Sequence, residues 1–303
     1  MNDLSHIRMR LGASLYVPAT RKDLSATISS PSPMARSLIV CTEDAVRHDE
    51  LEPALKNLEG ALAEMTTPGP ALRFIRARNP HVLGRILSMT GIEKIDGFVI
   101  PKATAESLPR YLAILPENER FLLMPTVETK EAFDARSMRA LRKILSGSSV
   151  RDRTLAIRIG GNDLLSVLGL RRPLDRTIYE TPVGDVISSL VGIFRPEGIG
   201  LTAPVFEGIG KPDVLEKETI ADLGRGLVGK TAIHPSQIPI IERVYRVSFE
   251  EMQMADAVLS DDAPAVFRLG DRMCEPATHA AWARETRLRA AAFGVERNSL
   301  AAE

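Results

Sequence analysis

The sequence predicts an α/β protein: a parallel (β/α)8 barrel of the TIM type over residues 1–259, followed by a C-terminal helical extension over 260–303. Eight short apolar segments rich in branched residues recur along the chain, and stretches of helical spacing follow them. Such segments are typical of buried parallel strands, and about 240 residues is the usual length of a closed barrel. An open doubly wound sheet is the alternative. It would usually carry a glycine-rich turn, and the chain contains no GxGxxG motif and no Walker loop.

The predicted elements follow one another at regular intervals. Between the second and third strands, apolar residues at three- and four-residue steps over 46–65 predict an amphipathic helix. After the eighth strand, helical spacing covers 239–259 and 279–293, with a turn at 261–264 between them. The predicted strands cover 14–19, 37–42, 71–76, 97–101, 121–127, 155–159, 198–204 and 230–235.

Composition limits the classes of function. With 303 residues and 44% hydrophobic content, the chain can bury a large core. Its 39 basic and 39 acidic residues balance, so we expect neither nucleic acid nor a membrane surface as a partner. Cys41 and Cys274 are far apart and show no metal-type spacing. No segment approaches the roughly 18 apolar residues of a membrane span, so we expect a soluble, cytoplasmic protein.

Two carboxylates stand in similar settings. Glu128 follows the fifth predicted strand, and Asp163 follows the sixth after Gly160-Gly161-Asn162. In a parallel barrel, these strand ends meet at one pocket that carries the chemistry. Two carboxylates about 4 to 6 Å apart would repel by a few kcal/mol unless one is protonated or a cation lies between them. Mg²⁺ fits best, because it takes few protein carboxylates and leaves positions for substrate oxygens. Alternatively, each acid caps only the helix that follows.

Further polar side chains follow other strand ends. Arg76 offers a planar guanidinium to a substrate carboxylate, and strand alternation predicts that Arg78 shares its face. Both therefore lie either in the pocket or in surface ion pairs on the helix side. Lys102 belongs either to the pocket or to the solvated surface, and we expect His234 to be a buried, hydrogen-bonded structural histidine. The remaining members of this ring are Arg21, Glu43 and Asp44. We expect a solvated loop, or else a phosphate-binding one, at Arg171, Arg172 and Arg176.

Several short motifs span most of the chain. They are Ile75-Arg76-Ala77-Arg78, Pro101-Lys102, Val127-Glu128-Thr129, Gly160-Gly161-Asn162-Asp163-Leu164, and the Gly-Lys and Ile-His-Pro-x-Gln-Ile pattern over 229–238. Together they resemble the HpcH/HpaI aldolase and citrate lyase beta-subunit (CitE-like) superfamily. The resemblance implies an Mg²⁺-dependent TIM barrel that cleaves or forms a carbon–carbon bond next to a carbonyl. It also implies a homo-oligomer, usually a trimer or a multiple of trimers.

The chain departs from this pattern at three points. Cys41-Thr42-Glu43-Asp44-Ala45-Val46 has one acid fewer than the family's Asp-Leu-Glu-Asp-Ala-Val, and Arg78 stands where the family usually has Asn. Asp44 stands where pyruvate aldolases of the HpaI type carry His, which argues against that branch. With residues 16–24, these features resemble a subgroup of C–C bond lyase-like proteins linked to tellurium-resistance-type gene clusters.

The resulting hypothesis is an Mg²⁺-dependent carbon–carbon lyase, or its reverse. It acts on a small 2-oxo or 3-hydroxy acid, free or as a CoA thioester, through a metal-stabilised enolate. The resemblance implies that Glu128 and Asp163 hold Mg²⁺ and that Arg76 binds the substrate oxygens.

Other roles at the site rest on fewer sequence features. The backbone N–H groups of Gly160 and Gly161 are candidates to hold the substrate carboxylate, and Lys102 is a further substrate contact. Asp44, or a carboxylate of a neighbouring subunit, is the candidate for proton transfer. Two other functions stay open: a CoA-independent pyruvate-type aldolase, and a non-catalytic barrel that binds a metabolite or assembles with partners.

Overall fold

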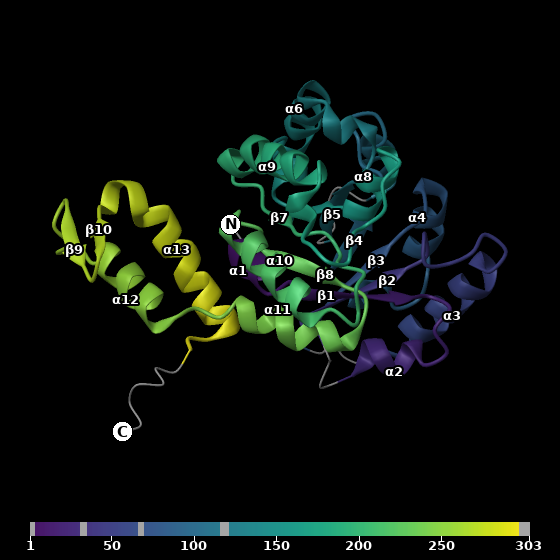
Figure 1. The fold of residues 1–303 in the computed structure, drawn as a ribbon. Helices are drawn as coiled ribbons and strands as arrows, with labels where there is room; N and C mark the ends of the chain where they lie inside the picture. The colour runs from purple at the N-terminus through teal and green to yellow at the C-terminus, as the bar shows by residue number, and fades with distance from the viewer. Residues whose placement is uncertain (1–3, 31–34, 66–69, 116–120, 297–303) are drawn as a thin grey trace.

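The computed structural model describes residues 4–30, 35–65, 70–115 and 121–296, and its centre is a barrel of eight parallel strands (Figure 1). The strand order is β7-β6-β5-β4-β3-β2-β1-β8. The edges β7 and β8 meet where Val228 N donates to Leu201 O at 2.9 Å and Ala203 N to Gly229 O at 2.7 Å, which confirms the predicted barrel. The strands are β1 (Gly12–Pro18), β2 (Ser37–Cys41), β3 (Leu72–Arg76), β4 (Gly97–Ile100), β5 (Leu122–Val127), β6 (Ile157–Ile159), β7 (Leu201–Thr202) and β8 (Gly229–Ala232).

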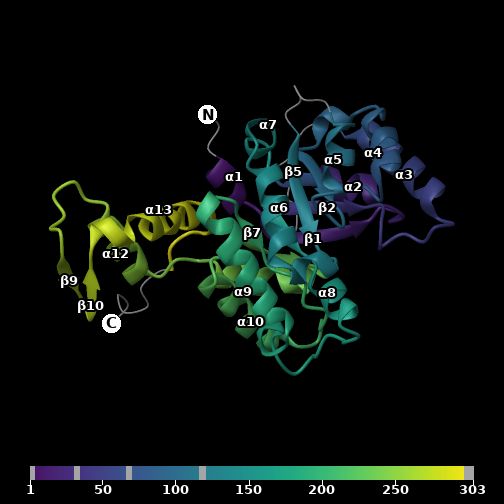
Figure 2. The same cartoon turned by 90° about the horizontal axis from the view of Figure 1, so that it is seen from above.

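Helices alternate with the strands and cover the outside of the barrel (Figure 2). In the described part of the chain, no helix is both long enough and apolar enough to cross a membrane. The helices are α1 (Leu4–Met9), α2 (Leu24–Ser29), α3 (Leu51–Glu64), α4 (Pro80–Leu87), α5 (Leu108–Leu112), α6 (Ala135–Leu145), α7 (Ser148–Arg151), α8 (Gly161–Val167), α9 (Val183–Phe194), α10 (Pro212–Gly224), α11 (Ile238–Val244), α12 (Phe249–Val258) and α13 (Pro276–Phe293).

The strands are apolar on both faces because both faces are buried. Every residue of β2, β3 and β4 is buried. One face packs into the barrel interior and the other against the helices, which explains continuous apolar runs in place of alternation. The interior core contains Ile39, Phe74, Val99 and Met124, with Tyr16 packed against it. This core closes the barrel below the mouth at which the strands end.

Two predicted helix boundaries were wrong. The helix predicted over 46–65 begins at Leu51, because the preceding residues form turns in which Val46 N donates to Glu43 O. The helix predicted over 239–259 is two helices, since α11 ends at Val244 and α12 begins at Phe249. Ser248 and Glu251 form a capping box that starts α12 anew, with Glu251 N donating to Ser248 Oγ at 3.1 Å.

The C-terminal part of the chain forms an arm that projects from the barrel in both views (Figures 1 and 2). In this arm, α12 packs against α13 through a small core of Ala255, Val258, Cys274 and Ala283. Between the two helices lies an antiparallel hairpin, β9 (Phe267–Leu269) and β10 (Arg272–Cys274), which the sequence analysis did not predict. The division at residue 259 stays a prediction, and residues 1–3 and 297–303 lie outside the described residues.

Candidate active site

The predicted site residues meet at the C-terminal ends of β2 to β6. The loop after β2 carries Glu43 and Asp44, β3 ends at Arg76, and Lys102 follows β4. A cavity of about 210 Å³ at this mouth is lined by Asp44, Arg76, Glu128, Gly160, Gly161 and Asp163, among others. Lys102 joins the same group through its ion pairs with Glu43 and Asp44. The fold therefore brings together the seven residues predicted to bind metal or substrate or to move a proton, and their roles stay predictions. They are Asp44, Arg76, Lys102, Glu128, Gly160, Gly161 and Asp163.

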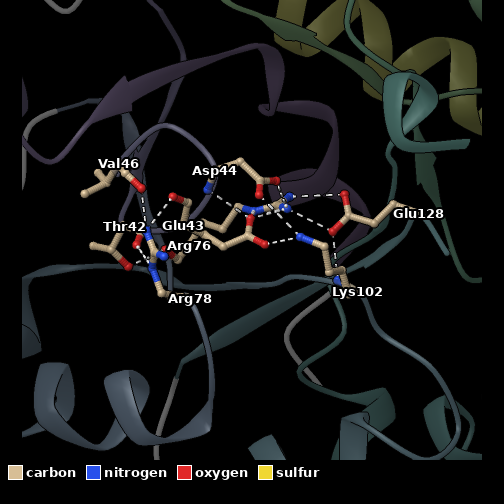
Figure 3. Close-up of polar contacts among 8 residues, drawn as sticks. All are labelled: Thr42, Glu43, Asp44, Val46, Arg76, Arg78, Lys102 and Glu128. Atoms are coloured by element: carbon tan, nitrogen blue, oxygen red, sulfur yellow. Dashed lines mark hydrogen bonds and ion pairs between the residues drawn. The ribbon is translucent and has the colours of Figure 1, made fainter. Parts of the chain in front are cut away.

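Arg76 lies at the centre of this group (Figure 3). Its side chain is 6% exposed and contacts three carboxylates. Nε donates to Glu43 Oε2 at 2.7 Å, and Nη2 donates to Glu128 Oε1 at 2.9 Å and to Asp44 Oδ2 at 3.2 Å. A longer bond of 3.4 Å joins Nη1 to Glu128 Oε2. The guanidinium thus neutralises and orients the acidic groups, of which Asp44 is the most exposed.

Lys102 holds Glu128 through its backbone. Its φ of 48° lies in the left-handed region, a conformation that costs a non-glycine residue about 1–3 kcal/mol and persists only where its surroundings impose it. In this conformation, Lys102 N donates to Glu128 Oε1 at 2.8 Å, while Nζ pairs with Glu43 and lies 3.3 Å from Asp44 Oδ1. The side chain is 47% exposed, so Lys102 belongs to both the pocket and the surface.

The site has an excess of negative charge. Burial and the negative charge of Asp163 raise the pKa of Glu128 to about 7, against the attraction of Arg76. Burial and the charge of Asp44 raise the pKa of Asp163 in the same way. When all groups at the mouth are ionised, the carboxylates exceed the cations Arg76 and Lys102 by two charges, and a divalent cation would balance them. The four carboxylates are Glu43, Asp44, Glu128 and Asp163.

The donor atoms fit a hard cation such as Mg²⁺. Glu128 and Asp163 present carboxylates to the cavity, and the Asn162 Oδ1 atom beside them is buried without a hydrogen-bond partner. The described residues contain no group of three or more His, Cys, Asp and Glu side chains arranged to hold a metal. Two carboxylates with open positions for water and substrate are what Mg²⁺ usually takes, whereas a closed structural zinc site requires four ligands.

The glycine turn before Asp163 is required by close packing. A Cβ atom on Gly160 would lie 2.4 Å from Glu128 Cβ and 2.5 Å from Glu128 Oε2. The prediction that both glycine N–H groups are free for a substrate was wrong for Gly160, whose N donates to Val127 O at 3.0 Å. Gly161 begins α8, so its N–H is one of the first-turn donors of that helix.

Arg78 does not share the position of Arg76, contrary to the prediction. Strand β3 ends at Arg76, and strand alternation ends with it. Arg78 instead donates to the backbone carbonyls of Thr42, Glu43 and Val46 (Figure 3). It therefore holds the loop that carries Asp44. Arg21 is also outside the cavity lining, in an ion pair with Asp23 at 2.6 Å.

The motif over 229–238 contributes Thr231 and Ile233 to the cavity lining, and its Lys230 and Gln237 make structural contacts. Lys230 is fully buried and pairs with Glu218 at 2.9 Å and Asp222 at 2.8 Å on α10. Gln237 is buried and accepts from Ile233 N at 2.9 Å. His234 is hydrogen-bonded as predicted, through Nδ1 to Ser236 Oγ, but it is exposed, because it caps a 3-10 turn at the barrel rim.

One residue of the predicted solvated loop is buried. Arg172 is 4% exposed and pairs with Glu218, whose other oxygen accepts from Lys230. Burial of this carboxylate between two cations explains why Arg172 leaves the surface. Arg171 and Arg176 are exposed, as predicted.

Arg158 in β6 is a cavity residue that is absent from the predicted site. Although it lies in an apolar strand, its side chain lines the cavity and is almost fully buried. The signal was its position: it is the one charged residue in an otherwise apolar strand that leads into the metal motif.

The fold and the site together define a class, that of TIM-barrel proteins with an acidic, semi-buried site at the C-terminal ends of the strands. The chain belongs to the family of C–C bond lyases of the TIM-barrel fold, whose model matches residues 5–295. This confirms the family resemblance and supports an enzymatic role.

Similar proteins agree with this assignment. A (3S)-malyl-CoA thioesterase from Cereibacter sphaeroides is 27% identical over 245 residues, 80% of this chain and 79% of that protein. The structure of CitE from Mycobacterium tuberculosis in complex with magnesium, acetoacetate and coenzyme A has a TM-score of 0.69 and 22% identity, covering 93% of this chain and 99% of that one. Haloferax volcanii malate synthase has a TM-score of 0.62 and 14% identity, and the match covers 76% of this chain and 72% of that one. At these identities, the two structures establish a shared fold.

Proposed function

We propose that this protein is an Mg²⁺-dependent carbon–carbon lyase, or catalyses the reverse reaction, on a small 2-oxo or 3-hydroxy acid, free or as a CoA thioester. The observation that carries the proposal is the pair of carboxylates, Glu128 and Asp163, in one cavity whose mouth has two more carboxylates than cations. Family membership and the magnesium of the CitE structure agree with it. Mg²⁺ held by Glu128 and Asp163 would supply positive charge that stabilises the negative charge developing on a substrate oxygen.

The residues of the chain bind and orient the substrate. Arg76 is fixed by Glu43 and Glu128, and its bond to the exposed Asp44 is the one that a substrate oxygen would replace. An arginine that is already oriented loses little freedom on binding. Lys102 adds a half-exposed positive charge beside Glu43 and Asp44.

Asp44 is the candidate to move a proton. Burial acts to raise the pKa of Asp44, but hydrogen bonding with Glu43 and the charges of Lys102 and Arg76 outweigh it and lower the pKa. Asp44 is therefore ionised at neutral pH and able to accept a proton from carbon next to a carbonyl. Displacement of its bond to Arg76 by substrate would free the carboxylate for this step.

The test is exchange of solvent deuterium into carbon, followed by proton NMR. Acetyl-CoA and pyruvate are each incubated with protein and Mg²⁺, with oxalate or glyoxylate added as an oxo-acid partner, and Glu128→Gln is the control. Exchange that requires both Mg²⁺ and Glu128 is the expected result. Exchange into acetyl-CoA selects a CoA-dependent reaction, and exchange into pyruvate selects a pyruvate-type aldolase. No exchange in either compound contradicts enolate chemistry on these substrates and favours a barrel that only binds.

Thioester hydrolysis is a second candidate, favoured by the similarity to a malyl-CoA thioesterase. A thioesterase releases free CoA thiol from malyl-CoA without forming an aldehyde, whereas a lyase releases glyoxylate and acetyl-CoA. Measurement of thiol and of glyoxylate in one reaction separates the two. The homo-oligomer, a trimer or a multiple, stays a prediction that light scattering tests.

A further inference from the structure

A buried arginine, Arg158, lies at the inner end of the cavity. Arg158 is 2% exposed. Its Nη2 donates to Thr231 Oγ1 at 2.5 Å, its guanidinium carbon lies 5.4 Å from the centre of the Tyr16 ring, and Nη1 lies 4.0 Å from Met124 Sδ. Among the described residues, no carboxylate forms an ion pair with Arg158, although those residues include ion-pair partners for the buried Arg76, Arg172 and Lys230.

An arginine in this setting is costly for a fold. A buried charge without a partner loses its hydration and gains little in return, and replacing such groups with apolar ones is often neutral or stabilising. The ring of Tyr16 and the hydroxyl of Thr231 offset only part of the charge. A ligand anion would complete the hydrogen bonding of this guanidinium.

The surroundings of Arg158 face the cavity that holds the predicted metal ligands. Arg158, Tyr16 and Thr231 line it together with Glu128 and Asp163. Arg158 pairs in register with Thr126, two residues before Glu128, so it lies deeper in the barrel than the carboxylates. The Thr126 Oγ1 atom also lines this end of the cavity and is buried without a hydrogen-bond partner. The inner end thus offers a positive charge and an unused hydroxyl.

We propose that Arg158, with Thr126, binds a second carboxylate of the substrate, so that the protein selects a dicarboxylic hydroxy or oxo acid over a monocarboxylic one. This inference rests on the proposed function, since it places the first carboxylate and the neighbouring oxygen at the mouth, near Glu128, Asp163 and Arg76. Arg158 is a positive charge at the inner end of the cavity, apart from the cations at the mouth, and a distal carboxylate would pair with it there.

The test compares two acids of equal chain length by titration calorimetry in Mg²⁺. Malate and 2-hydroxybutanoate differ only in a terminal carboxylate against a methyl group. The wild-type protein should bind malate about 10- to 100-fold more tightly, the range expected of charge-assisted hydrogen bonds. In Arg158→Met this preference should disappear because malate binding weakens, while 2-hydroxybutanoate binding stays unchanged. Arg158→Lys retains the positive charge but lacks the planar guanidinium that can donate two parallel hydrogen bonds, so it should keep part of the preference.

Each outcome decides the proposal. Equal weakening of both acids in Arg158→Met, or no change in either, would overturn the role of Arg158 and leave the proposed function intact. Failure of both acids to bind the wild-type protein in an Mg²⁺-dependent way would overturn both. The melting temperature of the unliganded Arg158→Met protein should not fall, because an arginine needed only for folding would lower it. If that variant does not fold, the Arg158→Lys titration decides alone: an unchanged ratio between the two acids would overturn the proposal.

Discussion

The buried lysine of β8 allows a quantitative test of the ion pairs that join this strand to helix α10. Lys230 is fully buried and bridges Glu218 and Asp222 on α10. Substitution of Lys230 by Met removes the cation and retains the length and apolar character of the side chain. Glu218 then keeps Arg172, whereas the Asp222 carboxylate keeps, among the described residues, only the hydroxyl of Tyr179 at 2.5 Å. One carboxylate is left buried without a counter-charge.

Removal of one partner from a buried ion pair typically costs about 3–5 kcal/mol of unfolding free energy. We expect a loss in this range for Lys230→Met at pH 8. Burial raises the pKa of Asp222 to about 6 against the attraction of Lys230, and Glu218 raises it further. Because this value lies above the unfolded value of 3.8, the contribution of Asp222 to stability is complete below pH 3.8 and is lost as pH rises through 6. Without Lys230 the folded pKa is higher still, so the loss should shrink at pH 5.

Urea unfolding at pH 5 and pH 8 measures this effect. The matched control is Lys217→Met on α10, the helix that carries both partners of Lys230. Lys217 is 67% exposed, and its Nζ lies 3.4 Å from Glu180 Oε2. Exposed pairs contribute about 0–1 kcal/mol, so the control should barely change the unfolding midpoint. The reasoning is refuted if Lys230→Met is as stable as the control, or if its loss is larger at pH 5 than at pH 8.

Further predictions concern the metal site. Glu128→Gln and Asp163→Asn should each weaken Mg²⁺ binding by about 100-fold or more in calorimetry, since loss of even an indirect metal partner costs 10- to 100-fold, whereas the exposed Asp185→Asn should not. Unchanged affinity in both variants would exclude these ligands. Gly160→Ala should also weaken Mg²⁺ binding, because its Cβ would displace the Glu128 carboxylate. Gly192→Ala, where a Cβ meets nothing within 4 Å, should leave binding unchanged and stabilise α9 by up to about 1 kcal/mol. Equal Mg²⁺ affinity in the two alanine variants would contradict the packing argument.

The barrel was predictable because its strands are buried on both faces. Segments such as 37–41 and 97–100 are wholly apolar or nearly so. The order and spacing of these segments are compatible with only a few strand topologies. Elements outside the barrel were harder to predict. The hairpin of β9 and β10 is short and half-exposed, and its only sequence signal is the Gly270-Asp271 pair at the turn, where Gly270 has a φ of 58°.

The predicted site residues came together because strand ends of a parallel barrel share one mouth. Their individual contacts did not follow from the sequence. Whether Arg78 lies beside Arg76 depends on the residue at which β3 ends, and sequence patterns do not resolve single-residue boundaries. Arg158 and Arg172 are buried through contacts with residues 73 and 46 positions away, and such long-range contacts leave no local pattern.

The most direct test of a metal site between Glu128 and Asp163 is anomalous diffraction from crystals grown with Mn²⁺, a hard cation that takes similar oxygen ligands. We predict one strong anomalous peak in the cavity, at about 2.0–2.2 Å from a carboxylate oxygen of each residue. The peak should be absent in crystals of Glu128→Gln. An Mn²⁺ peak away from these two residues, or no peak in the cavity at saturating Mn²⁺, would contradict the metal site and the lyase mechanism that depends on it.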